Sequence, residues 1–486
     1  MSHFSQLHDI PLDPVINGKR VKPSHERTWP TFDPANGEVL KEVPVADAGL
    51  VDQAVAAADA ALKGSFGSTL PAERSRILYR TAQLLRRDAE KLAAIESLDA
   101  GKPLREAKGD IETSARYFEY YAGIADKLQG DTIPLGPDYV SLTLHEPIGV
   151  TGHIIPWNFP LVTTARGIAP ALAAGATAVV KPAEQTPLTT LLLADYLAEA
   201  GLPDGAYNVV CGPGAETGAA LVAHPGIAHV TFTGSVRTGQ NVIRSAADHV
   251  ASTTMELGGK SPCVVLADAD LDAALEGVIK AIFMNSGQVC SAGSRLVIQK
   301  EIADAFLKKL VERTQKMSLG RGVDNPDLGP VVSAEQLSKI ASLVSAARAS
   351  GVEVLTGGEP AVVKGLEGGW FYSPTILVAS DPKQSIVQEE IFGPVLTVQI
   401  ADGFDHAIEL ANGTEFGLVA GIYTRDVSRA FRFAKAVDAG QVFINQYFAG
   451  GVETPFGGTK MSGFGREKGL EAVRSYYRVK TITARI

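Results

Sequence analysis

The residues best suited to covalent chemistry lie in one short segment, Asn285-Ser286-Gly287-Gln288-Val289-Cys290-Ser291-Ala292-Gly293-Ser294-Arg295. Cys290 comes after a run with helical patterning, Leu271 to Met284, and its neighbours are small or polar. A structural cysteine usually lies among apolar side chains and behaves as a small hydrophobe. Because Gly287 and Gly293 leave room around the sulfur, the thiolate of Cys290 could instead attack an incoming carbon. This segment alone leaves both interpretations open.

A second segment, 255–260, places a carboxylate in apolar surroundings. Glu256 lies between Met255 and Leu257 and is followed by two glycines. Burial disfavours the charged form of a carboxylate and raises its pKa, which makes Glu256 a candidate general base. A thiolate becomes populated only beside a base or a favourable dipole. Together the two segments favour nucleophilic catalysis by the cysteine.

A third segment, Ile155-Pro156-Trp157-Asn158-Phe159-Pro160, packs two aromatic residues and two prolines around one amide. A rigid loop of this kind can direct the side-chain N–H₂ of Asn158 at an oxyanion, beside the backbone N–H of Cys290. A structural asparagine cap is the alternative.

A glycine-containing turn, Phe232-Thr233-Gly234-Ser235, follows a predicted strand and opens a predicted helix. Glycine there lets backbone N–H groups approach a pyrophosphate at the positive end of a helix. The turn is not the G-x-G-x-x-G fingerprint, so an ordinary strand–turn–helix is the alternative.

The composition describes an acidic, soluble protein. A length of 486 residues exceeds one ordinary core, so about two or three domains are expected. The formal net charge of −9 argues against nucleic acid as the main partner. Three cysteines fit free thiols in a reducing compartment. The nine histidines show no H-x-H or H-E-x-x-H spacing, so no metal site is expected.

The chain shows no targeting signal. Residues 1–13 contain no apolar core of a signal peptide, and no run approaches the roughly 18 apolar residues of a membrane span. We therefore expect a cytoplasmic enzyme without a membrane partner.

The order of patterns predicts two α/β domains. Residues 1–50 form an extended lead-in with turns at 16–19 and 32–37, and alternating residues at 138–155 predict a strand excursion whose partner is the tail 476–486. Short apolar strands alternate with helices from Ile148 to Leu266, which predicts a doubly wound parallel sheet. Residues 260–456 repeat this alternation of strands and helices, which predicts a second α/β domain. Helices are predicted at 51–62, 73–98, 111–128, 168–174, 188–200, 215–223 and 239–247, and strands at 149–155, 178–181, 207–210, 230–233, 263–266, 296–299, 352–355, 386–400, 419–423 and 442–445. Cys290 lies near the join between the halves, where a cleft between domains is expected.

These motifs together resemble the aldehyde dehydrogenase superfamily of the hydrolytic, NAD(P)-dependent type, from about Asn17 to Thr481. The resemblance implies an α/β fold of two doubly wound domains, one Rossmann-like for the cofactor and one catalytic, plus a β-hairpin oligomerisation element. It implies a dinucleotide-binding domain at 1–124 and 148–259, a catalytic domain at 260–459, and the oligomerisation element at 125–147 and 470–486. It further implies a homodimer or homotetramer and a small-molecule aldehyde as substrate.

The resemblance also assigns site residues. It implies catalytic roles for Cys290, Glu256, Asn158 and Glu467. It implies cofactor contacts by Ile154, Pro156, Trp157, Lys181, Glu184, Gly214, Phe232, Thr233, Gly234, Ser235, Leu257, Glu390 and Phe392. It implies a substrate tunnel lined by Phe159, Arg166, Met284, Val289, Ser291, Tyr447, Phe448 and Phe456.

The cofactor expected from the resemblance is NAD, with NADP as a weaker alternative. Lys181 and Glu184 match the residues that hold the hydroxyls of the adenosine ribose. They follow a predicted strand, and the carboxyl ends of parallel strands face the ligand crevice. A carboxylate at Glu184 would repel a 2′-phosphate, which favours NAD.

One position departs from the family pattern. Many relatives carry a lysine of a proton relay with two glutamates where this chain has Gly167, directly after Arg166. A relay between Glu467 and Glu256 would therefore need water or a backbone carbonyl in the lysine's place.

The implied reaction oxidises an aldehyde to a carboxylic acid through a thiohemiacetal and a thioester on Cys290, with Glu256 activating the hydrolytic water. Three other functions are alternatives. A CoA-acylating relative would lack this glutamate, and a phosphorylating dehydrogenase would need a phosphate site that the sequence does not show. A structural homologue without catalysis would not need the intact Cys290, Glu256 and Asn158. Medium-sized apolar aldehydes, aliphatic or aromatic, are expected as substrates, and ω-carboxylate semialdehydes such as succinic semialdehyde are the alternative. Arg166 could grip such a carboxylate with its guanidinium fork, or form a surface ion pair at the tunnel mouth.

Overall fold

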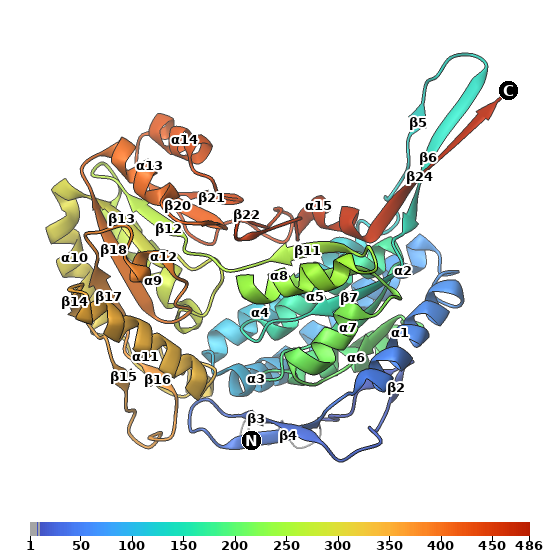
Figure 1. Cartoon of the computed structure of the whole chain (residues 1–486), viewed down its shortest axis with the longest axis horizontal. Coiled ribbons are helices and arrows are strands. Elements are labelled where there is room, and N and C mark those ends of the chain that lie inside the picture. The colour runs from blue at the N-terminus through green and yellow to red at the C-terminus, as the bar shows by residue number, and fades with distance from the viewer. Residues whose placement is uncertain (1–6, 8–9) are drawn as a thin grey trace.

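Two sheets organise the chain, and the computed structural model describes residue 7 and residues 10–486. The first part of the predicted lead-in, residues 1–6 and 8–9, lies outside the described residues. Figure 1 shows one sheet with its helices on the right, the other with its helices on the left, and a strand arm that projects from the right-hand part. The described lead-in and first helices comprise β1 (Val15–Ile16), β2 (Lys19–Arg20), β3 (Thr28–Phe32), β4 (Val39–Pro44), α1 (Ala48–Lys63), α2 (Pro71–Arg87), α3 (Ala89–Ala100) and α4 (Leu104–Ala122).

The first sheet has eight strands in the order β2-β1-β9-β8-β7-β10-β11-β23. The five consecutive strands β9, β8, β7, β10 and β11 run parallel, as the alternation of strands and helices predicted. The order reverses between β7 and β10, and open α/β sheets bind ligands outside the carboxyl ends of the strands at such a switch point. Its elements are β7 (Val150–Ile154), α5 (Pro160–Ala174), β8 (Thr177–Lys181), α6 (Leu188–Ala200), β9 (Tyr207–Val209), the π-helix η2 (Gly214–Gly218), α7 (Ala219–Ala223), β10 (Ile227–Thr233), α8 (Val236–Ala247), β11 (Ser252–Glu256) and β23 (Gly463–Phe464).

The second sheet has seven strands in the order β14-β17-β18-β13-β12-β20-β21, and all its pairings except β14 with β17 are parallel. Central strands β12 and β20 are entirely buried, as strands covered by helices on both faces must be. Its elements are β12 (Pro262–Val265), α9 (Leu271–Phe283), the 3₁₀ turn η3 (Met284–Gly287), β13 (Arg295–Gln299), α10 (Lys300–Thr314), α11 (Ala334–Ala349), β14 (Glu353–Thr356), β17 (Thr375–Val378), α12 (Ser385–Gln388), β18 (Val395–Ala401), α13 (Phe404–Asn412), β20 (Val419–Tyr423), α14 (Val427–Ala436) and β21 (Gln441–Ile444).

Smaller elements complete the fold. Short two-stranded pairs and helical turns connect the larger units. They are β15 (Pro360–Ala361) with β16 (Phe371–Tyr372), β19 (Phe416–Gly417) with β22 (Thr459–Lys460), η4 (Gly322–Asp324), α15 (Gly469–Val473) and η5 (Arg474–Tyr476).

The projecting arm is a three-stranded sheet in the order β24-β6-β5 (Figure 1). Strand β6 (Tyr139–Pro147) pairs antiparallel with β24 (Tyr477–Arg485) over its whole length, and β5 (Thr132–Ile133) lies at its other edge. The predicted pairing between the strand excursion and the tail is therefore confirmed within one chain. Apart from Tyr477, every residue of β24 is exposed.

Two predicted elements are wrong in extent. The helix expected over 73–98 is two helices, α2 and α3, separated at Asp88, and apolar spacing alone does not locate such a break. The strand expected over 386–400 is a helical turn, α12, then a loop, and strand β18 begins only at Val395. Phe392 in that loop has φ +60° and Pro394 cannot donate to a ladder, so neither continues a strand.

One further predicted strand belongs to the other sheet, and one strand of the first sheet was missed. Segment 263–266, expected as the last strand of the first sheet, corresponds to β12 at the centre of the second sheet. The actual end strand of the parallel run, β11, has the sequence Ser-Thr-Thr-Met-Glu, which is too polar to give an apolar strand signal. In the described part of the chain, no helix is long and apolar enough to cross a membrane.

Candidate active site

Cys290 follows a backbone turn that only tight packing can hold. Asn285, Ser286 and Gly287 have φ values of +49°, +53° and +74°, and left-handed residues in succession are costly for side chains other than glycine. A Cβ at Gly287 would lie 2.0 Å from the carbonyl oxygen of Gly393. The expectation that the glycines leave open space is therefore wrong, because Gly287 is needed for close contact between backbones.

The environment of Cys290 differs from that of the other two cysteines. Cys290 is half-buried, whereas Cys211 and Cys263 are buried. Burial raises the pKa of the Cys290 thiol to about 12, the positive charge of Arg166 opposes this rise, and the carboxyl of Glu256 adds to it. A thiol with such a pKa needs a base before it can act as a nucleophile at neutral pH.

Glu256 is the candidate base, at the end of β11. Its side chain is buried, and neither carboxylate oxygen makes a hydrogen bond to a residue that the structure describes. Burial, followed by the nearby carboxyl of Glu467, raises the pKa of Glu256 well above its usual value, while Arg166 and Arg466 oppose the rise. A carboxyl with a raised pKa and free oxygens suits a general base.

Arg166 lies at the centre of this charged cluster. Its Nε is 2.5 Å from Oε2 of buried Glu467, its Nη2 donates to Oγ1 of Thr233 at 3.3 Å, and its guanidinium carbon is 5.5 Å from the ring centroid of Phe456. The pair is buried, so the surface ion pair expected at the tunnel mouth is wrong. The side chain that meets Glu467 belongs to Arg166, one residue before Gly167 in α5, and what links Glu467 to Glu256 stays a prediction.

Asn158 reaches the cysteine loop with its side chain. Its Nδ2 donates to the carbonyl oxygen of Gln288 at 2.9 Å, two residues before Cys290, and the residue is 5% exposed. The amide has two N–H groups, and this bond uses one of them. The second N–H is not used by this bond, and the predicted role of Asn158 as an oxyanion donor stays a prediction.

The predicted phosphate turn opens helix α8 at the switch point of the first sheet. Strand β7 ends at Ile154 and its neighbour β10 ends at Thr233. Ser235 is the N-cap of α8 and its Oγ accepts from the backbone N–H of Thr238. A Cβ at Gly234 would lie 2.6 Å from the ring of Phe232. Gly234 therefore lets the ring of Phe232 pack against the turn, directly before the N-terminus of α8, and a helix N-terminus suits a pyrophosphate.

The predicted ribose residues come together at the end of β8. Lys181 Nζ is 2.8 Å from Oε2 of Glu184, and Oε1 of Glu184 accepts from the backbone N–H of Gly214 at 3.4 Å. Burial raises the pKa of Glu184, but Lys181 outweighs it, so that the pKa lies below its usual value. The carboxylate is thus charged and fixed, ready to accept from hydroxyls and to repel a phosphate.

A second group of predicted cofactor residues lies between the two sheets. Trp157 packs edge to face on Phe392 at 5.1 Å between ring centroids. Oε1 of Glu390 accepts from the backbone N–H of Gly259 at 2.9 Å, and a Cβ at Gly258 would lie 2.5 Å from Oε2 of Glu390. Pro156 and Leu257 sit in the same connections, directly after β7 and β11. The glycine-containing turns, the N-terminus of α8 and the charged carboxylate of Glu184 together fit a dinucleotide.

The predicted substrate residues separate into two groups. Phe159, Met284 and Phe448 are half-buried and pack, like Cys290, against the apolar core of the second domain. The buried group consists of Val289, Ser291, Tyr447 and Phe456. Tyr447 donates to the carbonyl oxygen of Ser291 and packs within the apolar core, so it supports the loop, and its place in the tunnel wall stays a prediction.

Met284 also lies beside a separate cavity of about 400 Å³. Residues of α4, α9 and α10 line that cavity, and Cys290 and Phe159 are absent from its lining. Among the described residues, no group of three or more metal-ligating side chains comes together.

Sequence reasoning missed three polar residues next to the site. Lys102 donates to the carbonyl oxygen of Asn158, Glu106 accepts from the backbone N–H of Asn285, and Asn285 donates to the same carbonyl as Lys102. The only signal was a lysine held between Gly101 and Pro103, after the predicted helix over 73–98.

Comparison with known proteins agrees with this geometry. The sequence matches the aldehyde dehydrogenase family over residues 21–482. It is 42% identical over 473 residues to betaine aldehyde dehydrogenase of Bacillus subtilis, covering 96% of each chain. It is 43% identical over 477 residues to retinal dehydrogenase 2 of Homo sapiens, covering 97% of this chain and 91% of the relative.

A solved structure is similar over the whole fold. Betaine aldehyde dehydrogenase of Staphylococcus aureus in complex with NAD⁺ superposes with a TM-score of 0.98 at 36% identity, covering 99% of this chain and 97% of that one. This similarity agrees with the dinucleotide cradle described above. The chain therefore belongs to the aldehyde dehydrogenase family and is an NAD-dependent aldehyde dehydrogenase.

Proposed function

We propose that the enzyme oxidises medium-sized apolar aldehydes to carboxylic acids through a thioester on Cys290. The observation that carries this substrate class is the pairing of Arg166 with Glu467, which neutralises the one arginine expected to grip a substrate carboxylate. Half-buried Phe159, Met284 and Phe448 share an apolar core with Cys290 and offer aldehydes an uncharged surface.

In the proposed reaction Glu256 accepts the thiol proton of Cys290, and the thiolate adds to the aldehyde carbon. The free N–H of the Asn158 amide and the backbone N–H of Cys290 stabilise the resulting oxyanion. The chemistry supplied by bound NAD is acceptance of the hydride that leaves this carbon, so that a thioester remains on Cys290.

Hydrolysis of the thioester completes the proposed cycle. Glu256 first releases the thiol proton to solvent and then takes a proton from a water molecule as the oxygen of that water adds to the thioester carbon. The same N–H groups stabilise the second oxyanion, which collapses to the carboxylic acid and expels the Cys290 thiolate. The positive charge of Arg166 opposes the rise in the pKa of Glu467, Glu256 and Cys290 that burial causes.

An ω-carboxylate semialdehyde is the second candidate substrate, because Arg166 does lie near Cys290. A substrate carboxylate would have to compete with Glu467 for the guanidinium, which already holds that partner at 2.5 Å. Such competition costs the enzyme its buried ion pair, and the unpaired charge that remains is expensive.

Replacing the nucleophile is the direct test of the reaction. Cys290→Ala is expected to abolish NADH formation with octanal, benzaldehyde and succinic semialdehyde, because no thiohemiacetal can form. Cys211→Ala and Cys263→Ala are matched controls at buried positions and should keep kcat within about threefold of wild type. Turnover of Cys290→Ala near the wild-type rate would contradict the assignment.

Arg166→Met tests both substrate class and pH dependence. Loss of the positive charge lets the pKa of Glu256 and Cys290 rise further, so the acid limb of kcat/KM with octanal should move to higher pH by about one unit. Arg166→Lys keeps the charge and should shift the limb less. We expect octanal and succinic semialdehyde to lose kcat/KM together.

The opposite result would support the second candidate. If succinic semialdehyde is the better substrate of wild type, and Arg166→Met loses activity with it alone, then Arg166 binds the substrate carboxylate and the apolar substrate class is wrong.

We also propose that the β24-β6-β5 arm pairs the enzyme with other copies as a dimer or tetramer. Leu144 and Ile482 lie on one face of the arm, at neighbouring register positions, and are 41% and 45% exposed. Apolar residues on an exposed sheet usually mark a contact surface.

Leu144→Asp with Ile482→Asp should therefore lower the assembly mass measured by light scattering, because burying two carboxylates in an apolar contact is costly. Thr143→Asp with Thr481→Asp is the control, since this directly paired couple lies on the other face. A wild-type monomer, or an unchanged mass in the first variant, would refute this role of the arm.

A further inference from the structure

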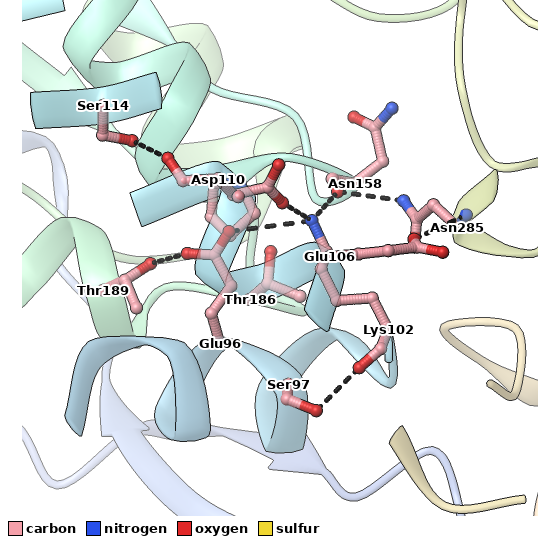
Figure 2. Close-up of polar contacts among 12 residues, drawn as sticks. Glu96, Ser97, Lys102, Glu106, Asp110, Ser114, Asn158, Thr186, Thr189 and Asn285 are labelled. Carbon is pink, nitrogen blue, oxygen red and sulfur yellow. Dashed lines mark hydrogen bonds and ion pairs between the residues drawn. The ribbon is translucent and has the colours of Figure 1, made fainter. Parts of the chain in front are cut away.

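A lysine ammonium group is buried beneath the catalytic loop, outside the residues used so far. Figure 2 shows Lys102, from the turn between α3 and α4, reaching the backbone of Asn158. Its side chain has no exposed surface, and Nζ donates to Oδ2 of Asp110 at 2.6 Å and to the carbonyl oxygen of Asn158 at 2.8 Å. Oε1 of Glu96 lies 3.7 Å away. A buried ammonium is costly unless it is paired, and here both carboxylates come from helices that pack beside it.

The ammonium keeps its proton in this site. Burial lowers the pKa of Lys102, but the carboxylates of Asp110 and Glu96 outweigh burial, so the pKa lies above its usual value. Lys102 is therefore a fixed cation whose donors point in set directions. One of its N–H groups donates to the main-chain carbonyl of Asn158, the residue whose side chain is the predicted oxyanion donor.

The same carbonyl has a second donor from the cysteine loop. Nδ2 of Asn285 lies 3.1 Å from the Asn158 oxygen and 3.3 Å from the Gln288 oxygen, and Oε2 of Glu106 accepts from the backbone N–H of Asn285 at 2.8 Å. Figure 2 shows Glu106, Asn285 and Asn158 around the Lys102 ammonium. The backbone of Asn158 is thereby tied to α4 and to the turn before Cys290.

Lys102 also contacts the next residue of this loop. Its Nζ lies 4.2 Å from the ring centroid of Phe159, within the range of a cation–π contact. The ammonium thus contacts both residues joined by the Asn158–Phe159 peptide bond, the first at its carbonyl oxygen and the second at its ring. Displacement of this backbone would break the hydrogen bond to the carbonyl and would move the Cα from which the Asn158 side chain projects.

We propose that Lys102 is a positioning residue for the oxyanion hole: by holding the Asn158 carbonyl, it sets the direction of the Asn158 amide at Cys290. This inference rests on the proposed function, in which that amide stabilises the oxyanion. Lys102 touches neither substrate nor cofactor in this role. Small displacements of a preorganised donor suffice to lower a rate strongly.

The test compares two reactions of Cys290 in the full-length enzyme. Single-turnover NADH formation passes through an oxyanion, whereas alkylation by iodoacetamide is a direct displacement that forms none. Lys102→Met should lower the single-turnover rate about tenfold or more, because a donor is misplaced, and should leave the alkylation rate within about twofold of wild type. Lys108→Met, at an exposed lysine of α4, is the control and should change neither rate.

The aldehyde is whichever of octanal, benzaldehyde and succinic semialdehyde the wild type oxidises fastest. A wrong substrate class then appears as a different fastest aldehyde in wild type, and the Lys102 comparison is unaffected. An unchanged single-turnover rate in Lys102→Met, or equal losses in both reactions, would overturn the proposal, since equal losses indicate general disruption of the loop.

Asn285→Gly provides the second variant if Lys102→Met does not fold. It removes the other donor to the Asn158 carbonyl and adds no buried charge, and glycine accepts the φ of +49° at this position. It should also lower the single-turnover rate more than the alkylation rate. No selective loss in this variant would overturn the proposal as well.

Discussion

The buried ion pair between Arg166 and Glu467 is the constraint on which the active site depends. Glu256 and Glu467 are both buried, burial raises the pKa of both, and the Glu467 carboxyl raises the pKa of Glu256 further, whereas a nearby cation opposes these rises. Arg166 supplies that cation beside Cys290, Glu256 and Glu467 at once. An arginine keeps its charge at any working pH, so it acts as a fixed charge and does not pass a proton along as a lysine could.

The two sheets bring this cluster together from distant parts of the chain. Arg166 comes from α5 and Glu256 from the end of β11, both in the first domain, whereas Cys290 follows α9 of the second. Hydrogen bonds then join the parts at close range, from Asn158 to Gln288 and from Asn285 to Glu106. The polar network of Lys102, Glu106 and Asn285 fixes the loop before Cys290, and the Arg166–Glu467 ion pair supplies charge near its thiol.

The sequence predicted the elements with strong local signals and missed what depends on packing. Alternating apolar segments located most strands, and the motifs around Cys290, Glu256 and Asn158 predicted residues that the structure brings together. The role of Gly287 could not be inferred, because the backbone of Gly393 that excludes a side chain there lies far along the chain. Arg166 could not be paired with Glu467 for the same reason, and Tyr447 gave no sign that it lies beneath the loop.

Trapping of the thioester tests most directly the claim that Glu256 acts on a covalent intermediate at Cys290. Glu256→Gln removes the base but keeps the size of the side chain, and the intact mass of the variant is measured after mixing with NAD⁺ and aldehyde. We expect an acyl adduct on Cys290 that persists while release of the acid is slow. Steady turnover at the wild-type rate without any adduct would contradict the account.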